Sequence, residues 1–220
     1  MRRLLPSIFR LLFSGKASPF VFEPQEVMLP SNPSSINLYI HLPFCRHICP
    51  FCPYVKEVYD PKQSAAYQRA LIKELKGYRG RWGEVKVDSV YFGGGTPSLT
   101  PEIIGETLDW IKGNFRLNNE IGVEVHPRDA TSPVLKSLKD SGVNMVSLGV
   151  QTFNDRRLKV LGRDYNSKLA REACRRVLGA GFSTVDIDLI FALPARAWTR
   201  WRTTSALPWS WAPTRYPPIP

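Results

Sequence analysis

The chain has no long apolar run and few cysteines. None of its apolar stretches could cross a bilayer as a helix, so we expect no transmembrane segment. Three of the 4 cysteines lie between positions 45 and 52, whereas a disulfide framework would scatter them more widely. This crowding argues against a disulfide-stapled fold and favours a shared metal centre in a reducing compartment. We therefore expect a cytoplasmic protein.

Acidic residues are missing from both ends of the chain. Arg2, Arg3, Arg10 and Lys16 lie in the first eighteen residues, and four arginines follow the last acid, Asp188. These ends carry eight of the +11 excess charges and leave about +3 on the middle. Because the charge belongs to the ends and not to a patterned face, and no known nucleic-acid module is present, we expect no nucleic-acid partner.

Composition divides the chain into three segments. Residues 1–35 contain five prolines and a short basic, apolar start, which predicts an extended lead-in and not a domain. Residues 36–194 alternate strand and helix patterns and form the predicted core domain. Residues 195–220 hold four of the 6 tryptophans, five prolines and no acid, without a strand or helix period. We interpret this tail as a shifted reading frame, with a genuine Trp- and Pro-rich docking tail as the alternative.

The core domain contains about five predicted βα repeats. Strands are expected at 36–42, 85–92, 121–125, 143–150 and 185–193, and helices at 64–78, 101–114, 133–140, 155–161 and 167–178. Thr100 is expected to cap the second helix. Because helices separate the strands, the strands should pair in parallel, which predicts an α/β fold with an open sheet that is doubly wound or part of a barrel. Ligands collect at the carboxyl ends of such strands.

The crowded cysteines have the spacing Cys45-x3-Cys49-x2-Cys52. Three thiolates can bind three corners of a [4Fe–4S] cubane and leave the fourth iron open to a small molecule. Structural zinc is the alternative, because His41 or His47 could supply the fourth ligand that such a site requires. The spacing favours the cluster and leaves zinc open.

Longer motifs around these cysteines carry a family resemblance. The strings are YIHLPFC at 39–45, YFGGGTPS at 91–98, SLGVQTF at 147–153 and LKVLGR at 158–163. Together with Phe51 before the third cysteine, they resemble the radical SAM superfamily. Within it they are similar to the oxygen-independent coproporphyrinogen III oxidase family and the related haem chaperone-type proteins. The resemblance extends over residues 36–194.

This resemblance implies a partial (βα)6 barrel in which Cys45, Cys49 and Cys52 hold a [4Fe–4S] cluster. S-adenosylmethionine (SAM) would bind the open iron, and one electron from the cluster would break a C–S bond to give a 5′-deoxyadenosyl radical. The implied partners are a reductant protein such as flavodoxin or ferredoxin and a porphyrinogen- or haem-type small molecule. The implied SAM contacts are Tyr39, Gly94, Gly95, Thr96, Glu124, Gln151, Arg163 and Asp188.

The residue types suit these implied roles. Glycines let the backbone approach a ligand closely, and a carboxylate such as Glu124 accepts hydrogen bonds from ribose hydroxyls. A guanidinium such as Arg163 can bind a carboxylate. Asp188 follows Asp186 by two residues on an otherwise apolar strand, where an unpaired acid is costly, so a ligand role has a physical motive. The plain alternatives are a flexible glycine turn, a surface acid at Glu124 and a core tyrosine at Tyr39.

The chain also departs from the family pattern. Pro53 and Tyr54 follow Cys52, where the oxidase proper has a further cysteine, and Ala192 stands where relatives commonly carry glycine. We interpret the sixth barrel unit and the C-terminal domain of the family as absent or scrambled in this sequence. Three hypotheses follow: an enzyme that oxidatively decarboxylates coproporphyrinogen III, a haem-binding or haem-delivery protein that keeps the cluster, and an inactive fragment or zinc-loop protein.

Overall fold

The computed structural model describes residues 29–191, and the compact unit that holds nearly all of them begins at Asn32. The predictions about most of the basic lead-in, about Ala192 and about the tail at 195–220 fall outside the described residues. Between residues 29 and 191, every helix is too short or too polar to cross a membrane.

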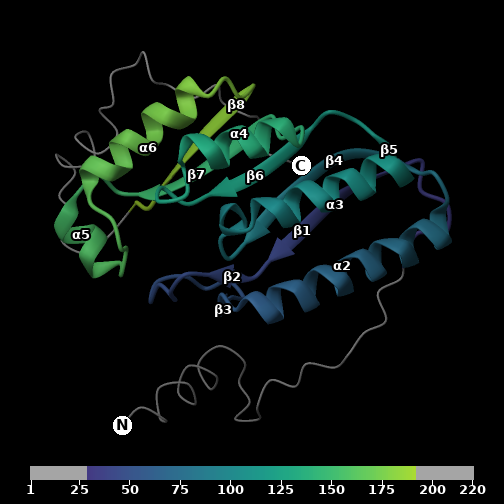
Figure 1. Ribbon diagram of the computed structural model, residues 1–220, viewed down its shortest axis with the longest axis horizontal. Coiled ribbons are helices and arrows are strands. Elements are labelled where there is room, and N and C mark those ends of the chain that lie inside the picture. Colours follow the sequence, from purple (N-terminus) through teal and green to yellow (C-terminus); the bar gives the residue numbers. More distant parts are fainter. Residues whose placement is uncertain (1–28, 192–220) are drawn as a thin grey trace, which may run out of the picture. The chain divides into compact units, whose positions relative to one another are not determined.

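Six strands form one parallel sheet in the order β1-β4-β6-β7-β8, with β5 beside β4 (Figure 1). A second, two-stranded parallel sheet, β2-β3, frames the cysteine loop. The strand bounds are β1 Ser35–Leu42, β2 Phe44–Cys45, β3 Glu57–Val58, β4 Lys86–Gly94, β5 Arg116–Leu117, β6 Ile121–Val125, β7 Met145–Gln151 and β8 Thr184–Leu189. The predicted α/β class with an open parallel sheet is therefore confirmed, and within 29–191 the sheet does not close into a barrel.

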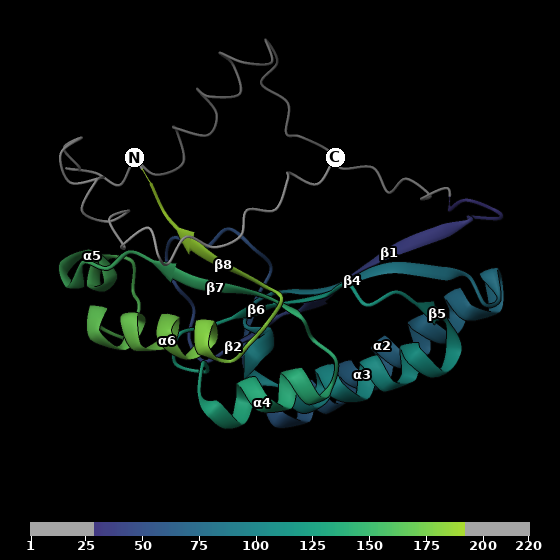
Figure 2. The ribbon, with the colours of Figure 1, turned by 90° about the horizontal axis from the view of Figure 1, so that it is seen from above.

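Helices cover one face of this sheet, as Figure 2 shows for α2, α3, α4 and α6. Buried strand residues such as Val90, Phe92, Val123 and Leu148, all 0% exposed, build the core beneath them. Side chains alternate along each strand, so the intervening residues lie on the opposite face, which is polar. The helix bounds are α2 Pro61–Trp82, η1 Pro97–Leu99 (a 3-10 turn), α3 Pro101–Asn114, α4 Ser132–Asp140, α5 Asp155–Val160 and α6 Ser167–Gly179.

The predicted helices are all present. Some of their ends differ from the predicted ends, and local contacts account for the differences. Helix α2 begins three residues earlier than predicted, because Asp60 accepts hydrogen bonds from the backbone N–H groups of Lys62 and Gln63 at 2.8 and 2.9 Å. Thr100 stands at the predicted N-cap position of α3, but its hydroxyl makes no capping hydrogen bond and donates to the carbonyl of Pro97 at 3.5 Å. Prolines at the first helical positions help to fix both starts.

The last strand is shorter than predicted. It ends at Leu189, whereas the sequence pattern predicted a strand to residue 193. The apolar run continues beyond the sheet pairing, and Phe191 is 75% exposed. An apolar run by itself does not set where hydrogen-bond pairing ends.

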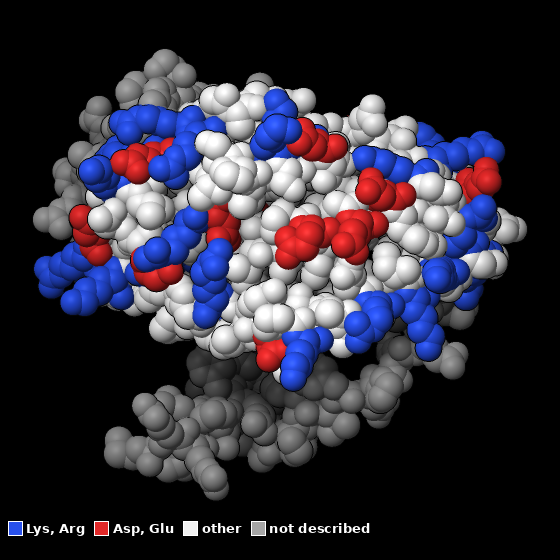
Figure 3. All heavy atoms as spheres, viewed as in Figure 1, with Lys and Arg blue, Asp and Glu red and all other residues white. Residues whose placement is uncertain are grey.

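Charges of both signs are interspersed on the helical face seen in Figure 3. Helical ion pairs contribute to this pattern, including Lys136 with Asp140 at 2.5 Å and Arg176 with Glu172 at 3.4 Å. Such exposed pairs contribute little to stability.

Candidate functional site

A pocket of about 510 Å³ lies at the carboxyl ends of the strands, between the cysteine loop and the sheet. This is the edge where parallel α/β sheets bind ligands. The structure brings ten of the eleven predicted site residues to its lining. They are Cys45, Cys49, Cys52, Gly94, Gly95, Thr96, Glu124, Gln151, Arg163 and Asp188.

The three cysteines of the loop are free thiols, and two of them are buried. Cys45 and Cys49 are each 8% exposed, and Cys52 is half-buried. The Thr96 hydroxyl donates to Cys45 Sγ at 3.5 Å. Burial raises the pKa of the Cys45 thiol, followed by the nearby Cys52 and Cys49 thiols, so this site favours the thiolate only when a cation shares it.

This donor set fits an iron–sulfur cluster. None of the three cysteines is in a disulfide, and all three line one pocket, which has room for a further ligand. In the described part of the chain, no three His, Cys, Asp or Glu side chains converge as ligands of a single ion. A cubane does not require such convergence, because each of its thiolates binds a different iron.

A buried carboxylate anchors the cysteine loop. Asp129 is 3% exposed and accepts hydrogen bonds from Arg46, which follows Cys45, and from the Ser98 hydroxyl at 3.1 Å. Ser98 in turn accepts the backbone N–H of His126 at 3.0 Å. The loop is thereby tied to η1 and to the segment after β6.

The two histidines of the loop region bond to backbone carbonyls. His41 Nε2 lies 2.8 Å from the carbonyl oxygen of Val55, and His47 Nε2 lies 3.0 Å from that of Gly162. Each histidine, named above as a candidate fourth zinc ligand, thus has its Nε2 engaged by a carbonyl. These contacts hold the loop from both sides, at β1 and after α5.

Two of the predicted glycines leave no room for a side chain. A Cβ on Gly94 would lie 2.8 Å from the His41 ring, and its φ of 119° lies in a region that favours glycine. A Cβ on Gly95 would lie 2.5 Å from the carbonyl oxygen of Pro43. The segment is therefore a tightly packed strand end and not a loose turn.

The predicted carboxylates Glu124 and Asp188 occupy the sheet side of the pocket. Glu124 Oε2 accepts the backbone N–H of Gly94 at 3.1 Å, and Asp188 Oδ2 accepts the Ser147 hydroxyl at 2.8 Å. Burial raises the pKa of both groups, and the charge of Asp188 raises that of Glu124 further. A ligand that donates hydrogen bonds to either carboxylate would therefore stabilise its charged form.

Gln151 and Arg163 line the same pocket. Gln151 has φ 65°, a left-handed conformation that is unusual for a side-chain-bearing residue and often marks functional sites. The Arg163 guanidinium donates to the Gly149 carbonyl at 2.7 Å, to the Tyr165 hydroxyl at 3.0 Å and to Cys49 Sγ at 3.7 Å. The last contact joins the segment after α5 directly to the cysteines.

The remaining predicted residue, Tyr39, lies beside the pocket and not in its lining. Its side chain is on the edge strand β1, and the residue is 60% exposed. The hydroxyl lies 3.3 Å from His41 Nδ1, and the ring stacks on Tyr91 with centroids 6.3 Å apart. A direct SAM contact of Tyr39 stays a prediction.

The lining residues that were not among the sequence candidates include His126 and Tyr91. His126 lies among cationic groups: burial, followed by the charge of Arg163, lowers its pKa to about 2, so the ring is neutral. In the sequence, only its position two residues after Glu124 indicated that His126 could line the site. For Tyr91 the only indication was its position two residues before the three glycines.

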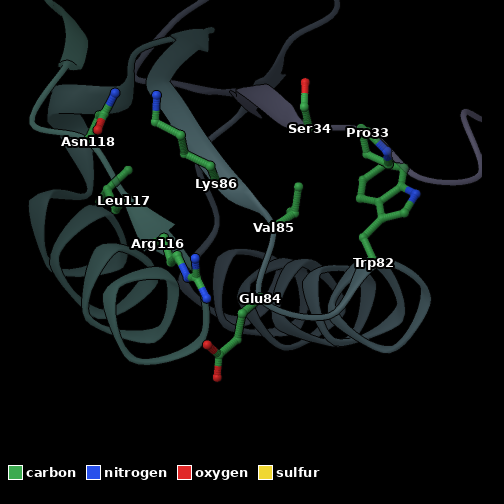
Figure 4. A pocket seen from close by; sticks show the side chains of 9 residues that line it. All are labelled: Pro33, Ser34, Trp82, Glu84, Val85, Lys86, Arg116, Leu117 and Asn118. Atoms are coloured by element: carbon green, nitrogen blue, oxygen red, sulfur yellow. The ribbon is translucent and has the colours of Figure 1, made fainter.

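A second hollow, of about 700 Å³, lies at the opposite ends of the strands (Figure 4). It is open to solvent and is lined by Trp82, Lys86, Arg116 and Asn118, among others. Lys86 is already paired with Asp88 at 2.6 Å. None of the predicted site residues lies here, so size does not identify the functional pocket.

Comparisons with known proteins match the part of the chain that builds the pocket. A family model described as the Radical SAM superfamily matches residues 39–195. The heme chaperone HemW of Lactococcus lactis is 38% identical over 163 residues, which cover 73% of this chain and 42% of the relative. The oxygen-independent coproporphyrinogen III oxidase of Bradyrhizobium diazoefficiens is 34% identical over 166 residues, covering 73% and 37%.

The fold is likewise similar to a solved structure. Coproporphyrinogen III oxidase (HemN) from Escherichia coli, described as a radical SAM enzyme, superposes with a TM-score of 0.73 at 30% identity. The match covers 80% of this chain and 42% of that one. The chain thus spans about two fifths of the length of these relatives.

Proposed function

This chain belongs to the radical SAM superfamily, and we propose that its pocket holds a [4Fe–4S] cluster beside S-adenosylmethionine. Cys45, Cys49 and Cys52 would hold the cluster. When bound and reduced by a flavodoxin- or ferredoxin-type protein, the cluster would supply one electron, which splits SAM into methionine and a 5′-deoxyadenosyl radical. The convergence of ten predicted residues on one pocket carries this proposal.

The protein groups would bind and orient SAM. The Arg163 guanidinium suits its carboxylate, while Glu124 and Asp188 suit its ribose hydroxyls and cationic part. Gln151 and Thr96 would add polar contacts.

The first experiment tests the cluster. Anaerobic reconstitution followed by iron and sulfide analysis and EPR of the reduced protein should show a [4Fe–4S] cluster. Cys45→Ala should lose it, whereas Cys174→Ala, which removes a fully buried thiol on α6 outside the pocket, should keep it. Equal iron and sulfide contents in both variants would refute the assignment, and stoichiometric zinc in the isolated protein would favour the alternative.

The second experiment tests the reaction. Cluster-loaded protein given SAM and dithionite should form 5′-deoxyadenosine and methionine, measured by mass spectrometry. Glu124→Gln should lower this yield while retaining the cluster. Intact SAM after prolonged incubation with a reduced, fully loaded cluster would overturn the proposed reaction.

We further propose that the substrate is of the porphyrin type and is oxidatively decarboxylated, in the manner of coproporphyrinogen III oxidase, in the cytoplasm. The similarity to that oxidase supports this candidate. Haem binding and delivery is the second candidate. It is favoured by the similarity to HemW and by Pro53 and Tyr54, which stand where the oxidase has a further cysteine.

Two measurements distinguish these candidates. Anaerobic incubation with coproporphyrinogen III should give decarboxylated products if the chain acts as an oxidase. Titration with haem should give a saturable change in the Soret absorbance if the chain is a haem carrier. A saturable haem complex without decarboxylation would reverse our preference.

A further inference from the structure

Tyr165 is a buried tyrosine between α5 and α6 that the proposed function does not use. It is 7% exposed and directly precedes Asn166, whose side chain caps α6 by accepting the backbone N–H of Leu169 at 3.0 Å. The His126 ring packs edge-on against the Tyr165 ring, with the two centroids 5.3 Å apart. The cap and this ring contact fix the position of the phenol.

The Tyr165 hydroxyl makes hydrogen bonds in both directions. It shares its single hydrogen between the backbone carbonyls of Val150 at 2.9 Å and Gly149 at 3.1 Å, near the end of β7. It also accepts the Nε–H of Arg163 at 3.0 Å. Burial raises the pKa of the phenol to about 12, so the hydroxyl keeps its hydrogen at neutral pH. The hydroxyl therefore links Arg163 to the backbone of β7.

The Arg163 guanidinium uses three of its five N–H groups within the fold. Nε donates to the Tyr165 hydroxyl, Nη2 donates to the Gly149 carbonyl at 2.7 Å, and Nη1 donates to Cys49 Sγ at 3.7 Å. Between residues 29 and 191, no partner takes the other two N–H groups, one on each terminal nitrogen. A carboxylate that binds a guanidinium through two parallel hydrogen bonds requires two such groups.

We propose that Tyr165 is a positioning residue for SAM, whose hydroxyl holds the Arg163 guanidinium ready for the SAM carboxylate. This inference rests on the proposed function, in which Arg163 binds that carboxylate. An arginine side chain has many rotamers, and fixing it before the ligand arrives lowers the entropy that binding costs. Tyr165 does not line the pocket, so it acts through Arg163.

The first test is equilibrium binding of SAM to the cluster-loaded protein. Tyr165→Phe keeps the ring, whose centroid lies 5.0 Å from the guanidinium carbon of Arg163, and removes only the hydroxyl. We expect SAM to bind about 3- to 10-fold more weakly, the effect of one hydrogen bond. KM for SAM should rise, while the rate of 5′-deoxyadenosine formation at saturating SAM stays unchanged.

A double-mutant cycle separates positioning from general damage. Arg163→Met keeps the length of the side chain, removes every N–H group and should itself weaken SAM binding. In this background Tyr165→Phe should not weaken binding further, because the group that the hydroxyl positions is gone. An equal loss of affinity in both backgrounds would refute the proposal.

A second readout needs neither cluster nor SAM. In the apo protein the Nε–H of Arg163 should exchange slowly with water, as measured by heteronuclear NMR, and the signal that is missing in Arg163→Met identifies it. In Tyr165→Phe this hydrogen should exchange faster, because its acceptor is lost. Tyr78→Phe is the matched control: it removes a phenol that donates to Glu74 at 3.0 Å on α2, outside the pocket lining, and should change neither the exchange rate nor SAM binding.

The outcomes distinguish the two proposals. If the loaded wild type binds SAM and Tyr165→Phe binds it equally well, the role of Tyr165 is refuted and the proposed function stands, even where the variant melts at a lower temperature. An unchanged exchange rate of the Arg163 Nε–H in Tyr165→Phe would refute it as well. If the loaded wild type binds no SAM, the proposed function fails, and the role of Tyr165 fails with it.

Discussion

At the scale of single residues, the pocket separates groups of opposite charge. Arg163 bonds to Cys49 on the side of the cysteine loop, while Glu124 and Asp188 lie on the sheet side. A cluster with its thiolates is anionic and suits the cationic side. SAM carries a carboxylate and a sulfonium centre, so a pocket divided in this way suits its two ends.

The raised pKa of Glu124 gives a test that needs no cofactor. In the folded protein its carboxyl binds a proton more readily than in the unfolded chain, mainly because of burial. This contribution to stability is complete below the unfolded pKa and is lost as the pH rises through the folded pKa. We therefore expect apo Glu124→Gln to melt above the wild type at pH 7.5, with the difference shrinking towards pH 4.

The same variant should lose affinity for SAM. Replacing the carboxylate by an amide removes a charge-assisted hydrogen bond, so binding should weaken about 10- to 100-fold. In the wild type, affinity should fall as the pH is lowered and Glu124 is protonated. Thermal melts and equilibrium dialysis measure both effects. A variant that is less stable at neutral pH and binds SAM normally would contradict this account.

At the scale of elements, the cysteine loop owes its position to contacts with distant segments. Asp129, after β6, holds Arg46 although 83 residues separate them in sequence. The guanidinium is half exposed, but the carboxylate is buried and also holds Ser98. Loss of the carboxylate would leave two donors without their partner.

We expect Asp129→Ala to destabilise the fold by about 1–3 kcal/mol and to speed the loss of iron from the loaded protein. Asp140→Ala breaks an exposed pair with Lys136 on α4 and should change stability by less than about 0.5 kcal/mol. Urea unfolding and the rate of iron release to a chelator measure the two effects. Iron release at the wild-type rate from Asp129→Ala would show that the loop does not depend on this anchor.

The close packing of β4 and β6 gives a second prediction at this scale. Gly122→Ala places a methyl group against the Tyr91 ring and should destabilise the fold by about 1–3 kcal/mol through overpacking. In a Tyr91→Ala background the ring is gone, so the same substitution should cost little. A double-mutant cycle from urea unfolding measures this coupling. Equal costs in both backgrounds would show that the ring does not occupy this gap.

At the scale of the whole molecule, the sheet is open and its two edge strands differ from the centre. Strands β4 and β6 each pair on both sides, while β1 and β8 pair on one side within residues 29–191. Helices cover one face, and the site lies at the carboxyl ends of the strands. The part of the chain that builds the pocket matches about two fifths of the relatives' length.

Hydrogen exchange should reveal this difference. Backbone amides of Val90, Phe92 and Val123 are in the buried centre and should exchange slowest. Amides of β8 near Asp188 and Leu189 should exchange faster, because this edge is the more exposed part of the sheet. Mass spectrometry of peptides from the apo protein measures both. Equal protection of β6 and the end of β8 would indicate that β8 pairs with a further strand.

Local sequence patterns were sufficient for the class of fold, and together with the family resemblance for most of the candidate site. The apolar periods placed the five main strands and the helices, because burial on one face repeats at a fixed spacing. The cysteine spacing and the family resemblance pointed to residues that share one pocket, among them Gly94, Glu124 and Asp188. Their place at the ends of parallel strands agrees with this, since parallel strands end at the same edge.

The tertiary structure alone decided which side chains meet across that edge. It placed Tyr39 beside the pocket, Arg46 on Asp129, and Tyr91 over Gly122. Each contact joins residues far apart in the chain, and it depends on strand order, register and the space that a glycine leaves. A single sequence encodes these only through the packing of the whole sheet, because local propensity acts over a few residues while register is fixed by burial across strands.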